Sequence, residues 1–306
     1  MIKYISILAT LLFMSACTPD PQLPDLPPGA QAISFTGDTL MKPEIYPGQI
    51  QALENDLKDA AEVYRKDPED PEAIIWLGRR SAYLGEYRDA VKIFTEGIYK
   101  HPENPEMYRH RGHRYITLRM PDKAIEDLLN AVSMIRDTDD KTEEDGIPNP
   151  INEPRTTLQF NIWYHLGLAY YIKGDFKSAA DAYAKCLEVS TNDDMLVATL
   201  YWYYMALRRA GLDEEAGDLL DRISEEMDII ENHSYHQLLL VFKGIFTPDS
   251  LLGSSEDIVQ NATIGYGIGN WHFINDRKNR AFTIWNRVLR SGTWPAFGYI
   301  AAEAEL

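Results

Sequence analysis

The sequence predicts an all-α protein in which similar helical hairpins stack side by side. The first observation is a period of thirty-four residues, which relates Pro68 to Pro102 and Gly78 to Gly112. The second is that apolar residues within each period recur at helical spacing. A fixed period of this length is typical of repeats that each supply one pair of helices and contact only their neighbours. We therefore expect the chain to grow along one axis.

Residues 1–16 have the character of a targeting segment. A short basic start precedes an almost wholly apolar run from Tyr4 to Phe13, and small residues directly precede Cys17. The apolar run is shorter than the ~20 residues that a membrane-spanning helix requires. The arrangement resembles the signal peptide of bacterial lipoproteins, including its lipobox, which implies lipidation of Cys17. The alternative is an ordinary secretory signal in which the cysteine is incidental.

Residues 17–48 are predicted to be an extended tether, because they contain seven prolines and no helical period. A capping helix follows between residues 49 and 65, where Leu53, Leu57 and Tyr64 fall on one face. Pro68 then prevents the helix from continuing.

Fixed positions of each period hold small, aromatic or aliphatic residues in the same order. The third copy has Trp163, Leu166, Gly167, Tyr170, Gly174, Phe176, Ala179 and Tyr183, and the first has Ile74, Leu77, Gly78, Tyr87, Ala90, Phe94, Gly97 and Pro102. These spacings resemble the tetratricopeptide repeat. The resemblance implies a right-handed superhelix of about five to six helix-turn-helix repeats. In such repeats small residues let paired helices cross closely, and large residues fill the space between hairpins.

The same resemblance divides the chain into two blocks of repeats. Residues 49–136 hold the capping helix and repeats 1 and 2, and residues 157–306 hold repeat 3 onward. Within the second block, residues 233–256 are expected to form a degenerate repeat, and a C-terminal capping helix is expected from about Ala296.

Between the blocks, residues 137–156 break the period with an acidic and proline-rich insertion. Its carboxylates are those of Asp137, Asp139, Asp140, Glu143, Glu144, Asp145 and Glu153. Pro148, Pro150 and Pro154 exclude a helix. We interpret the insertion as a solvated loop, and the alternative is an acidic loop that contacts a basic partner or a cation. Its spacing does not match a calcium-binding loop.

Charge and cysteine content narrow the class of protein. The formal net charge of −17 argues against binding to nucleic acid, which requires clustered Lys and Arg. A hydrophobic content of 45% favours a packed protein over a disordered one. Besides Cys17 the chain contains only Cys186, so we expect no intrachain disulfide and a buried thiol at Cys186.

The sequence lacks the common catalytic signatures, and we expect neither an enzyme nor a cofactor. Gly265, Gly267 and Gly269 superficially suggest a phosphate loop, but no predicted strand precedes them and Gly269 fits the repeat. His110 and His113 lie one helical turn apart between arginines, and a zinc site would need a third ligand that the sequence does not supply. We therefore expect no metal.

In tetratricopeptide folds the first helix of each hairpin lines a concave groove, and the resemblance carries those positions onto this chain. The groove residues so predicted are Arg79, Tyr83, Arg109, His113, Asn161, Tyr164, Tyr171, Tyr201, Arg208, Arg209, Tyr266 and Asn270. They are basic and aromatic although the chain is acidic, and arginines can fork onto carboxylates. The alternative is that the tyrosines pack between repeats and the arginines pair with neighbouring acidic residues.

Together these features favour a lipid-anchored scaffold of the bacterial cell envelope, at the outer membrane, that binds an acidic protein or peptide in its groove. The expectation rests on the resemblance, because similar lipoproteins act as adaptors for envelope assembly machines or hydrolases. Two alternatives remain: a glycan- or small-molecule-binding lipoprotein that uses groove aromatics, and an enzyme with an unrecognised site.

Overall fold

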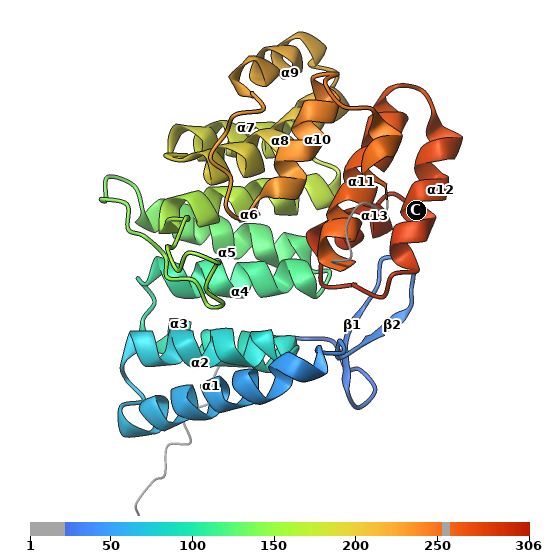
Figure 1. Ribbon diagram of the computed structural model, residues 1–306. Helices are drawn as coiled ribbons and strands as arrows, with labels where there is room; N and C mark the ends of the chain where they lie inside the picture. Colours follow the sequence, from blue (N-terminus) through green and yellow to red (C-terminus); the bar gives the residue numbers. More distant parts are fainter. Residues whose placement is uncertain (1–21, 253–257) are drawn as a thin grey trace, which may run out of the picture.

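The computed structural model describes residues 22–252 and 258–306 (Figure 1). The predicted signal peptide and Cys17 lie outside the described residues. The described chain is an all-α superhelix of stacked helix-turn-helix repeats, as predicted, with one short β-hairpin near its start. None of the helices in the described segments is long and apolar enough to cross a membrane.

A single helix begins the stack and paired helices follow it. The α-helices are α1 (Pro47–Lys66), α2 (Pro71–Tyr83), α3 (Tyr87–Lys100), α4 (Pro105–Thr117), α5 (Pro121–Met134), α6 (Leu158–Lys173), α7 (Phe176–Glu188), α8 (Asp193–Ala210), α9 (Asp213–Leu219), α10 (His233–Phe242), α11 (Ile258–Ile274), α12 (Lys278–Leu289) and α13 (Phe297–Glu303). Two short 3₁₀ helices, η1 (Leu220–Arg222) and η2 (Pro248–Leu251), follow α9 and α10. α10 and η2 lie within residues 233–256, for which the sequence predicts a degenerate repeat.

Local sequence signals set where the helices begin and end. The side chains of Asp70 and Asn104 accept hydrogen bonds from backbone amides in the first turns of α2 and α4, and a proline occupies the first position of each helix. At the other end, Gly174 and Gly211 terminate α6 and α8 with φ of 83° and 79°, a conformation that glycine adopts without strain.

Close crossing within hairpins depends on the glycines that define the repeat. A Cβ atom at Gly78 would lie 2.5 Å from the ring of Phe94, and one at Gly167 would lie 2.7 Å from the ring of Tyr183. The large side chain therefore fills the space that the absent Cβ leaves, as the sequence predicts. Gly269 shows the same relationship in α11, and this excludes the phosphate loop that its sequence context suggests.

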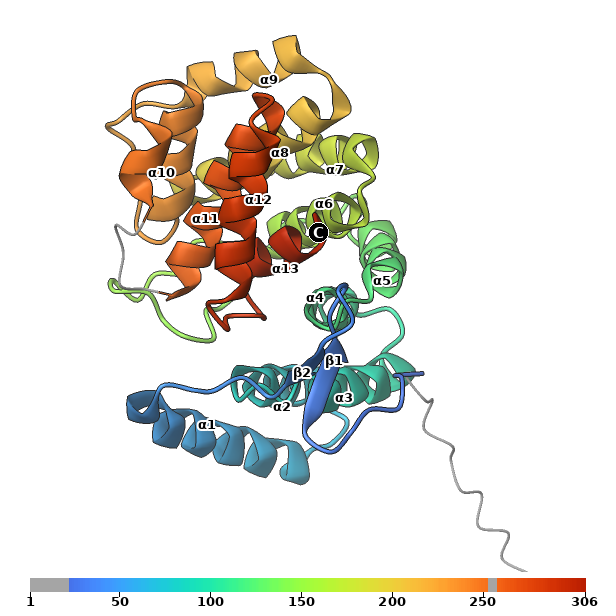
Figure 2. The same ribbon diagram turned by 90° about the vertical axis from the view of Figure 1, so that its right-hand side faces the viewer.

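The first helices of successive hairpins form the inner wall, which we define as the surface of α2, α4, α6, α8 and α11. α2 contacts α4, α4 contacts α6, α6 contacts α8 and α8 contacts α11. The stack rises from α1 to α9 and then turns back, so that α11, α12 and α13 lie beside the earlier repeats (Figures 1 and 2). As a result α13 contacts α6.

The segment predicted to be a tether is folded over much of its described length. Strands β1 (Ala30–Ile33) and β2 (Thr39–Met41) pair in antiparallel fashion, with Ala32 opposite Leu40. The hairpin contacts the C-terminal part of the chain, because Trp294 Nε1 donates to the carbonyl of Met41 at 3.0 Å and Phe35 N donates to Glu303 Oε1 at 2.6 Å. Proline content predicts an extended backbone but does not reveal such partners.

Candidate binding surface

The structure brings four of the predicted groove residues to one cavity. Arg79 and Tyr83 on α2 and Arg109 and His113 on α4 line a space of about 270 Å³ at the N-terminal end of the inner wall. We call this space the N-terminal pocket; its other lining residues are Ala82, Phe94, His110, Arg114, Glu143, Glu144, Asp145, Gly146, Ile147 and Thr156. A space of this size suits a small molecule or one or two side chains of a partner.

The acidic insertion supplies the second side of the N-terminal pocket. Glu143 Oε1 pairs with Arg109 Nη2 at 2.9 Å, and Arg79 Nη2 donates to the backbone carbonyl of Glu144 at 2.6 Å. Arg80 Nη1 donates to the carbonyl of Gly146 at 2.7 Å. The interpretation of the insertion as a solvated loop is therefore wrong for Glu143 and Gly146, which are buried, whereas the Glu144 side chain is exposed. The basic partner of this part of the loop is the chain's own inner wall.

Glycine at position 146 permits this close approach. A Cβ atom there would lie 1.6 Å from the hydroxyl oxygen of Tyr83. Asn161 holds the same loop from α6, because its Nδ2 donates to Glu143 Oε2 at 3.2 Å and to Thr156 Oγ1 at 3.0 Å. The insertion is thus fixed by α2, α4 and α6 together.

Burial shifts the pKa values of two of the three arginines that line the pocket. Burial lowers the pKa of Arg109, although Glu143 opposes the shift. Burial also lowers the pKa of Arg114 to about 10, and Arg109 and Arg79 lower it further while Tyr87 and Tyr83 raise it. Arg109 is buried and paired with Glu143, and Arg114 is half-buried; desolvation of a guanidinium is energetically costly, so groups shifted in this way mark a candidate functional site.

The two nearby histidines are neutral members of this site. Burial lowers the pKa of His110 well below its usual value, and Arg109 and Arg79 lower it further. His110 stacks on Phe94 with ring centroids 5.5 Å apart, and His113 lies 4.4 Å from the ring of His165. Within the described ranges, no group of three or more His, Cys, Asp or Glu residues is arranged to hold a metal ion.

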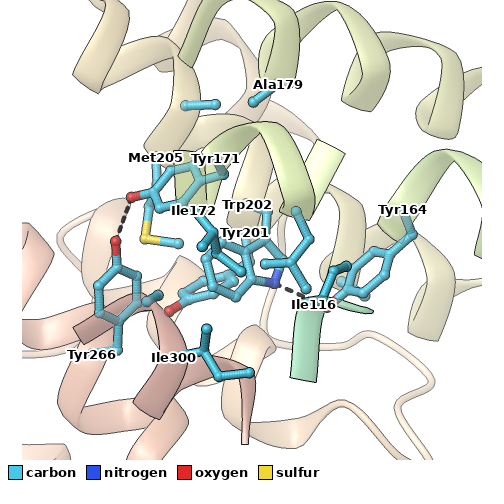
Figure 3. Packing of buried hydrophobic residues seen from close by; sticks show 14 of the residues in the cluster. Ile116, Tyr164, Tyr171, Ile172, Ala179, Tyr201, Trp202, Met205, Tyr266 and Ile300 are labelled. Carbon is cyan, nitrogen blue, oxygen red and sulfur yellow. Dashed lines mark hydrogen bonds between the residues drawn. The ribbon is translucent and has the colours of Figure 1, made fainter. Parts of the chain in front are cut away.

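The C-terminal half of the inner wall is covered by the chain itself. Tyr164, Tyr171, Tyr201 and Tyr266 are all buried. Tyr266 Oη donates to Tyr171 Oη at 2.7 Å, and Trp202 Nε1 donates to Tyr164 Oη at 2.9 Å (Figure 3). These aromatic groups pack between helices, as the alternative reading of the sequence allows.

Helix α13 and the C-terminus complete this cover. Ile300 of α13 is fully buried in the same cluster as Tyr201 and Tyr266 (Figure 3). Phe297, at the start of α13, lies with its ring centroid 5.2 Å from that of His113. The end of the chain therefore reaches the edge of the N-terminal pocket.

The remaining predicted groove residues have partners within the chain. Arg209 pairs with Glu305 at 2.6 Å and donates to Asn270 Oδ1 at 3.2 Å. Arg208 pairs with Asp213 at 2.7 Å, beyond the end of α8, and does not line the N-terminal pocket. The predicted residues thus divide into an N-terminal set, whose members line the N-terminal pocket although Arg79 and Arg109 are only 8% and 7% exposed, and a C-terminal set that is covered or paired within the chain.

Arg114, Arg119 and Glu303 are not among the residues that the sequence predicts to be functional. Arg114 follows His113 in a run of basic residues, and that run was the available signal. Arg119 and Glu303 lie 184 positions apart and pair at 2.7 Å, so no local pattern connects them. Cys186 is buried as expected, and burial raises the pKa of its thiol to about 12 while a hydrogen bond with Thr199 lowers it.

These features define a helical-repeat protein whose inner wall is partly covered by the C-terminal segment of its own chain. A family model described as the tetratricopeptide repeat matches residues 160–193, which include most of α6 and all of α7. The chain therefore contains a tetratricopeptide repeat at the centre of the stack.

Solved structures of other repeat proteins are similar to this chain at low identity. YrrB, whose structure is described as that of a TPR protein with an unusual peptide-binding site, is 13% identical over 76% of this chain and 91% of its own, with a TM-score of 0.44. A MamA protein structure is 16% identical over 65% of this chain and 89% of its own, with a TM-score of 0.44.

Proposed function

We propose that this protein is a lipid-anchored scaffold of the bacterial cell envelope that binds an acidic segment of a protein partner at the N-terminal pocket. The observation that carries the proposal is the position of Arg79 and Arg109 on adjacent inner-wall helices, lining one open cavity with Tyr83. Arginine forks recognise carboxylates through paired hydrogen bonds, and tyrosine supplies rigid contact area.

The insertion already provides an example of this recognition within the chain. The Glu143 carboxylate pairs with Arg109, and the Glu144 carbonyl accepts from Arg79. An acidic peptide would make the same kinds of contact with the same guanidinium groups. The chain's net charge of −17 would repel such a partner at a distance, so the guanidinium groups of the pocket would determine where it binds.

Covering of the C-terminal half restricts the proposed surface to α2, α4 and the insertion. A peptide lying along the whole inner wall would have to displace α13 and break the Arg209–Glu305 pair. The glycan-binding alternative has less support, because four of the five predicted groove tyrosines, Tyr164, Tyr171, Tyr201 and Tyr266, are buried between helices. Catalysis is not part of the proposal.

Lipid anchoring would place this pocket near a membrane and raise its local concentration there. The proposal rests on residues 1–17 of the sequence. It is tested by metabolic labelling with an alkyne fatty acid in a bacterial host. We expect Cys17→Ser to lose the label and leave the membrane fraction, whereas Cys186→Ser should keep both. Equal labelling of Cys17→Ser would refute the anchor.

The peptide-binding proposal is tested with a library of synthetic peptides in which Asp and Glu are compared with Asn and Gln. We expect the acidic members to bind selectively, and we expect Arg79→Met to weaken them about tenfold, which corresponds to one charge-assisted contact. Arg208→Met is the matched control, because it removes the same charge outside the pocket. Equal binding by the acidic and amide peptides, or an equal loss in both variants, would refute the proposal.

A further inference from the structure

Three arginines line the N-terminal pocket, and one carboxylate of its lining pairs with one of them. Arg79, Arg109 and Arg114 all contribute to the cavity, and Glu143 pairs with Arg109. Asp145 also lines the cavity: Asn149 Nδ2 donates to its carboxylate at 3.4 Å, and burial raises the pKa of Asp145 while the charge of Arg79 lowers it. The pocket thus contains guanidinium charge that the insertion does not pair.

Arg114 is the clearest case of an unpaired charge. In the described part of the chain, no carboxylate oxygen lies within salt-bridge distance of its guanidinium. The guanidinium carbon of Arg114 lies 5.4 Å from the centroid of the Tyr87 ring. A tyrosine face attracts a cation but does not neutralise it.

Two further donors beside the cavity are unsatisfied. Arg109 Nη1 donates to His110 Nδ1 at 2.9 Å, so the neutral His110 ring carries its proton on Nε2. Arg109 Nε and His110 Nε2 are both buried without a hydrogen-bond partner among the described residues. The residues themselves are 7% and 5% exposed. Buried donors without acceptors are rare in folded proteins and are often explained by a ligand or ion.

The groups that lack a partner here are the Arg114 guanidinium and the donors Arg109 Nε and His110 Nε2, the last lying 3.8 Å from the Glu143 carboxylate; the carboxylates of Glu144 and Asp145 also line the cavity. A bound neutral donor would leave them unsatisfied, and a bound cation would be repelled. An oxyanion supplies both the acceptor atoms and the compensating charge. The volume of about 270 Å³ accommodates a small molecule without displacement of the insertion.

We propose that the N-terminal pocket binds a small oxyanion, the carboxylate or phosphate group of a small molecule, between Arg114, Arg109 and Arg79. The site is formed with the insertion in place, so it does not require a peptide partner. Arg114 is its principal ligand residue. This residue is absent from the set on which peptide binding is proposed, and the two proposals can fail separately.

The site is tested on the folded protein by nuclear magnetic resonance of arginine side chains labelled with ¹⁵N. Inorganic phosphate and succinate are the probes, each titrated at constant ionic strength against chloride. We expect at least one probe to shift the Nε–H resonances of Arg109 and Arg114 in a saturable manner. A response to phosphate alone assigns a phosphate ligand, a response to succinate alone assigns a carboxylate, and a response to both assigns a general oxyanion site.

Arg114→Met is the decisive variant and Arg65→Met is its control, since Arg65 lies exposed on α1 outside the pocket. We expect Arg114→Met to weaken the probe about tenfold and Arg65→Met to leave its affinity unchanged. Arg114→Lys retains the charge but not the fork, so an intermediate affinity is expected. Absence of a saturable shift with both probes, or an equal affinity in Arg114→Met, would overturn the proposal.

Folding does not confound this comparison, because Arg114 makes no ion pair in the described structure. A purely structural role for Arg114 requires that Arg114→Met lower the thermal midpoint in chloride alone. A ligand role predicts that the midpoint in chloride stays the same or rises and that only the increase produced by the bound probe is lost. A lowered midpoint in chloride together with undiminished probe binding contradicts the proposal.

Discussion

Glu303 in α13 pairs with Arg119 in the turn between α4 and α5, with Oε2 and Nη2 2.7 Å apart and both side chains almost fully buried. Arg119 Nη2 also donates to the carbonyl of Trp294 at 2.9 Å, and Glu303 Oε1 accepts from Phe35 N at 2.6 Å. One ion pair therefore joins the second repeat, the C-terminal segment and the N-terminal hairpin. It fixes α13 against the inner wall.

Breaking this pair should strongly destabilise the packing of α13 against the inner wall. We expect Glu303→Gln and Arg119→Met each to lower the free energy of unfolding by about 3–5 kcal/mol, because each leaves a buried partner uncompensated. The double variant Arg119→Met with Glu303→Met should recover much of the loss. Urea denaturation measures all three.

The exposed Lys42–Glu86 pair provides the comparison, since its side chains are 41% and 36% exposed. Lys42→Met should cost no more than about 1 kcal/mol. A cost of similar size for Glu303→Gln would show that the buried pair does not hold the ends of the superhelix together.

The repeat could be predicted from the sequence because its determinants are local. Gly78 and Phe94 lie within one period, and their contact follows from helical spacing alone. The pattern also places Tyr171 and Tyr266 on the inner wall. It could not reveal that the wall is covered there, because the cover depends on pairs such as Arg119 with Glu303 that are distant in sequence.

The distinction between local and distant contacts also explains which parts of the N-terminal pocket could be predicted from the sequence. Arg79 and Arg109 were found because each occupies a groove-lining position of its repeat; with a period of thirty-four residues, the equivalent of Arg79 in the next repeat is His113. The insertion has no period, so its fold over α2 depends on single contacts such as that between Gly146 and Tyr83. Such contacts leave no signal in one sequence, and the acidic composition of the loop was compatible with full solvation.

Helix packing at the glycine positions gives a second prediction. Gly269→Ala should lower the free energy of unfolding by about 1–3 kcal/mol, because its Cβ would lie 2.2 Å from Trp285 Nε1 and force the indole to move. Gly217→Ala in α9 is the matched control, since no atom lies within 4 Å of its Cβ. That change should stabilise the helix by about 0.5–1 kcal/mol. Thermal denaturation of both variants distinguishes packing from helix propensity, and equal effects would contradict the packing argument.

Buried histidines should make stability depend on pH. Burial lowers the pKa values of His110 and His165 well below 6.5 in the folded protein, and Arg109 lowers both further. The unfolded chain therefore binds more protons than the folded chain below pH ~6.5. The contribution of these neutral histidines to the free energy of unfolding should be fully present above that pH. It should decrease as the pH falls toward the folded-state pKa values, by up to about 1.4 kcal/mol per pH unit for each histidine.

Urea denaturation between pH 7.5 and pH 5 tests this dependence through its slope. His165→Gln should reduce the slope by about 1.4 kcal/mol per pH unit, whatever its effect on stability at neutral pH. His233→Gln, at an exposed position, should leave the slope unchanged. An unchanged slope in His165→Gln would show that this histidine does not remain neutral in the folded protein.

Glu143 is both a structural partner of Arg109 and a competitor for any anion that enters the N-terminal pocket. Glu143→Gln should lower the free energy of unfolding by about 1–3 kcal/mol, because the charge-assisted contact at 2.9 Å is lost. It should at the same time raise the affinity for an acidic peptide or for phosphate about tenfold, because Arg109 is released.

Glu144→Gln is the control: it changes the net charge equally, its side chain is exposed, and its backbone carbonyl still accepts from Arg79. Calorimetric titration and urea denaturation of both variants measure the two effects. Lower stability without a gain in affinity would mean that Glu143 only holds the insertion in place. Equal gains in affinity in both variants would mean that the gain arises from the change in net charge alone.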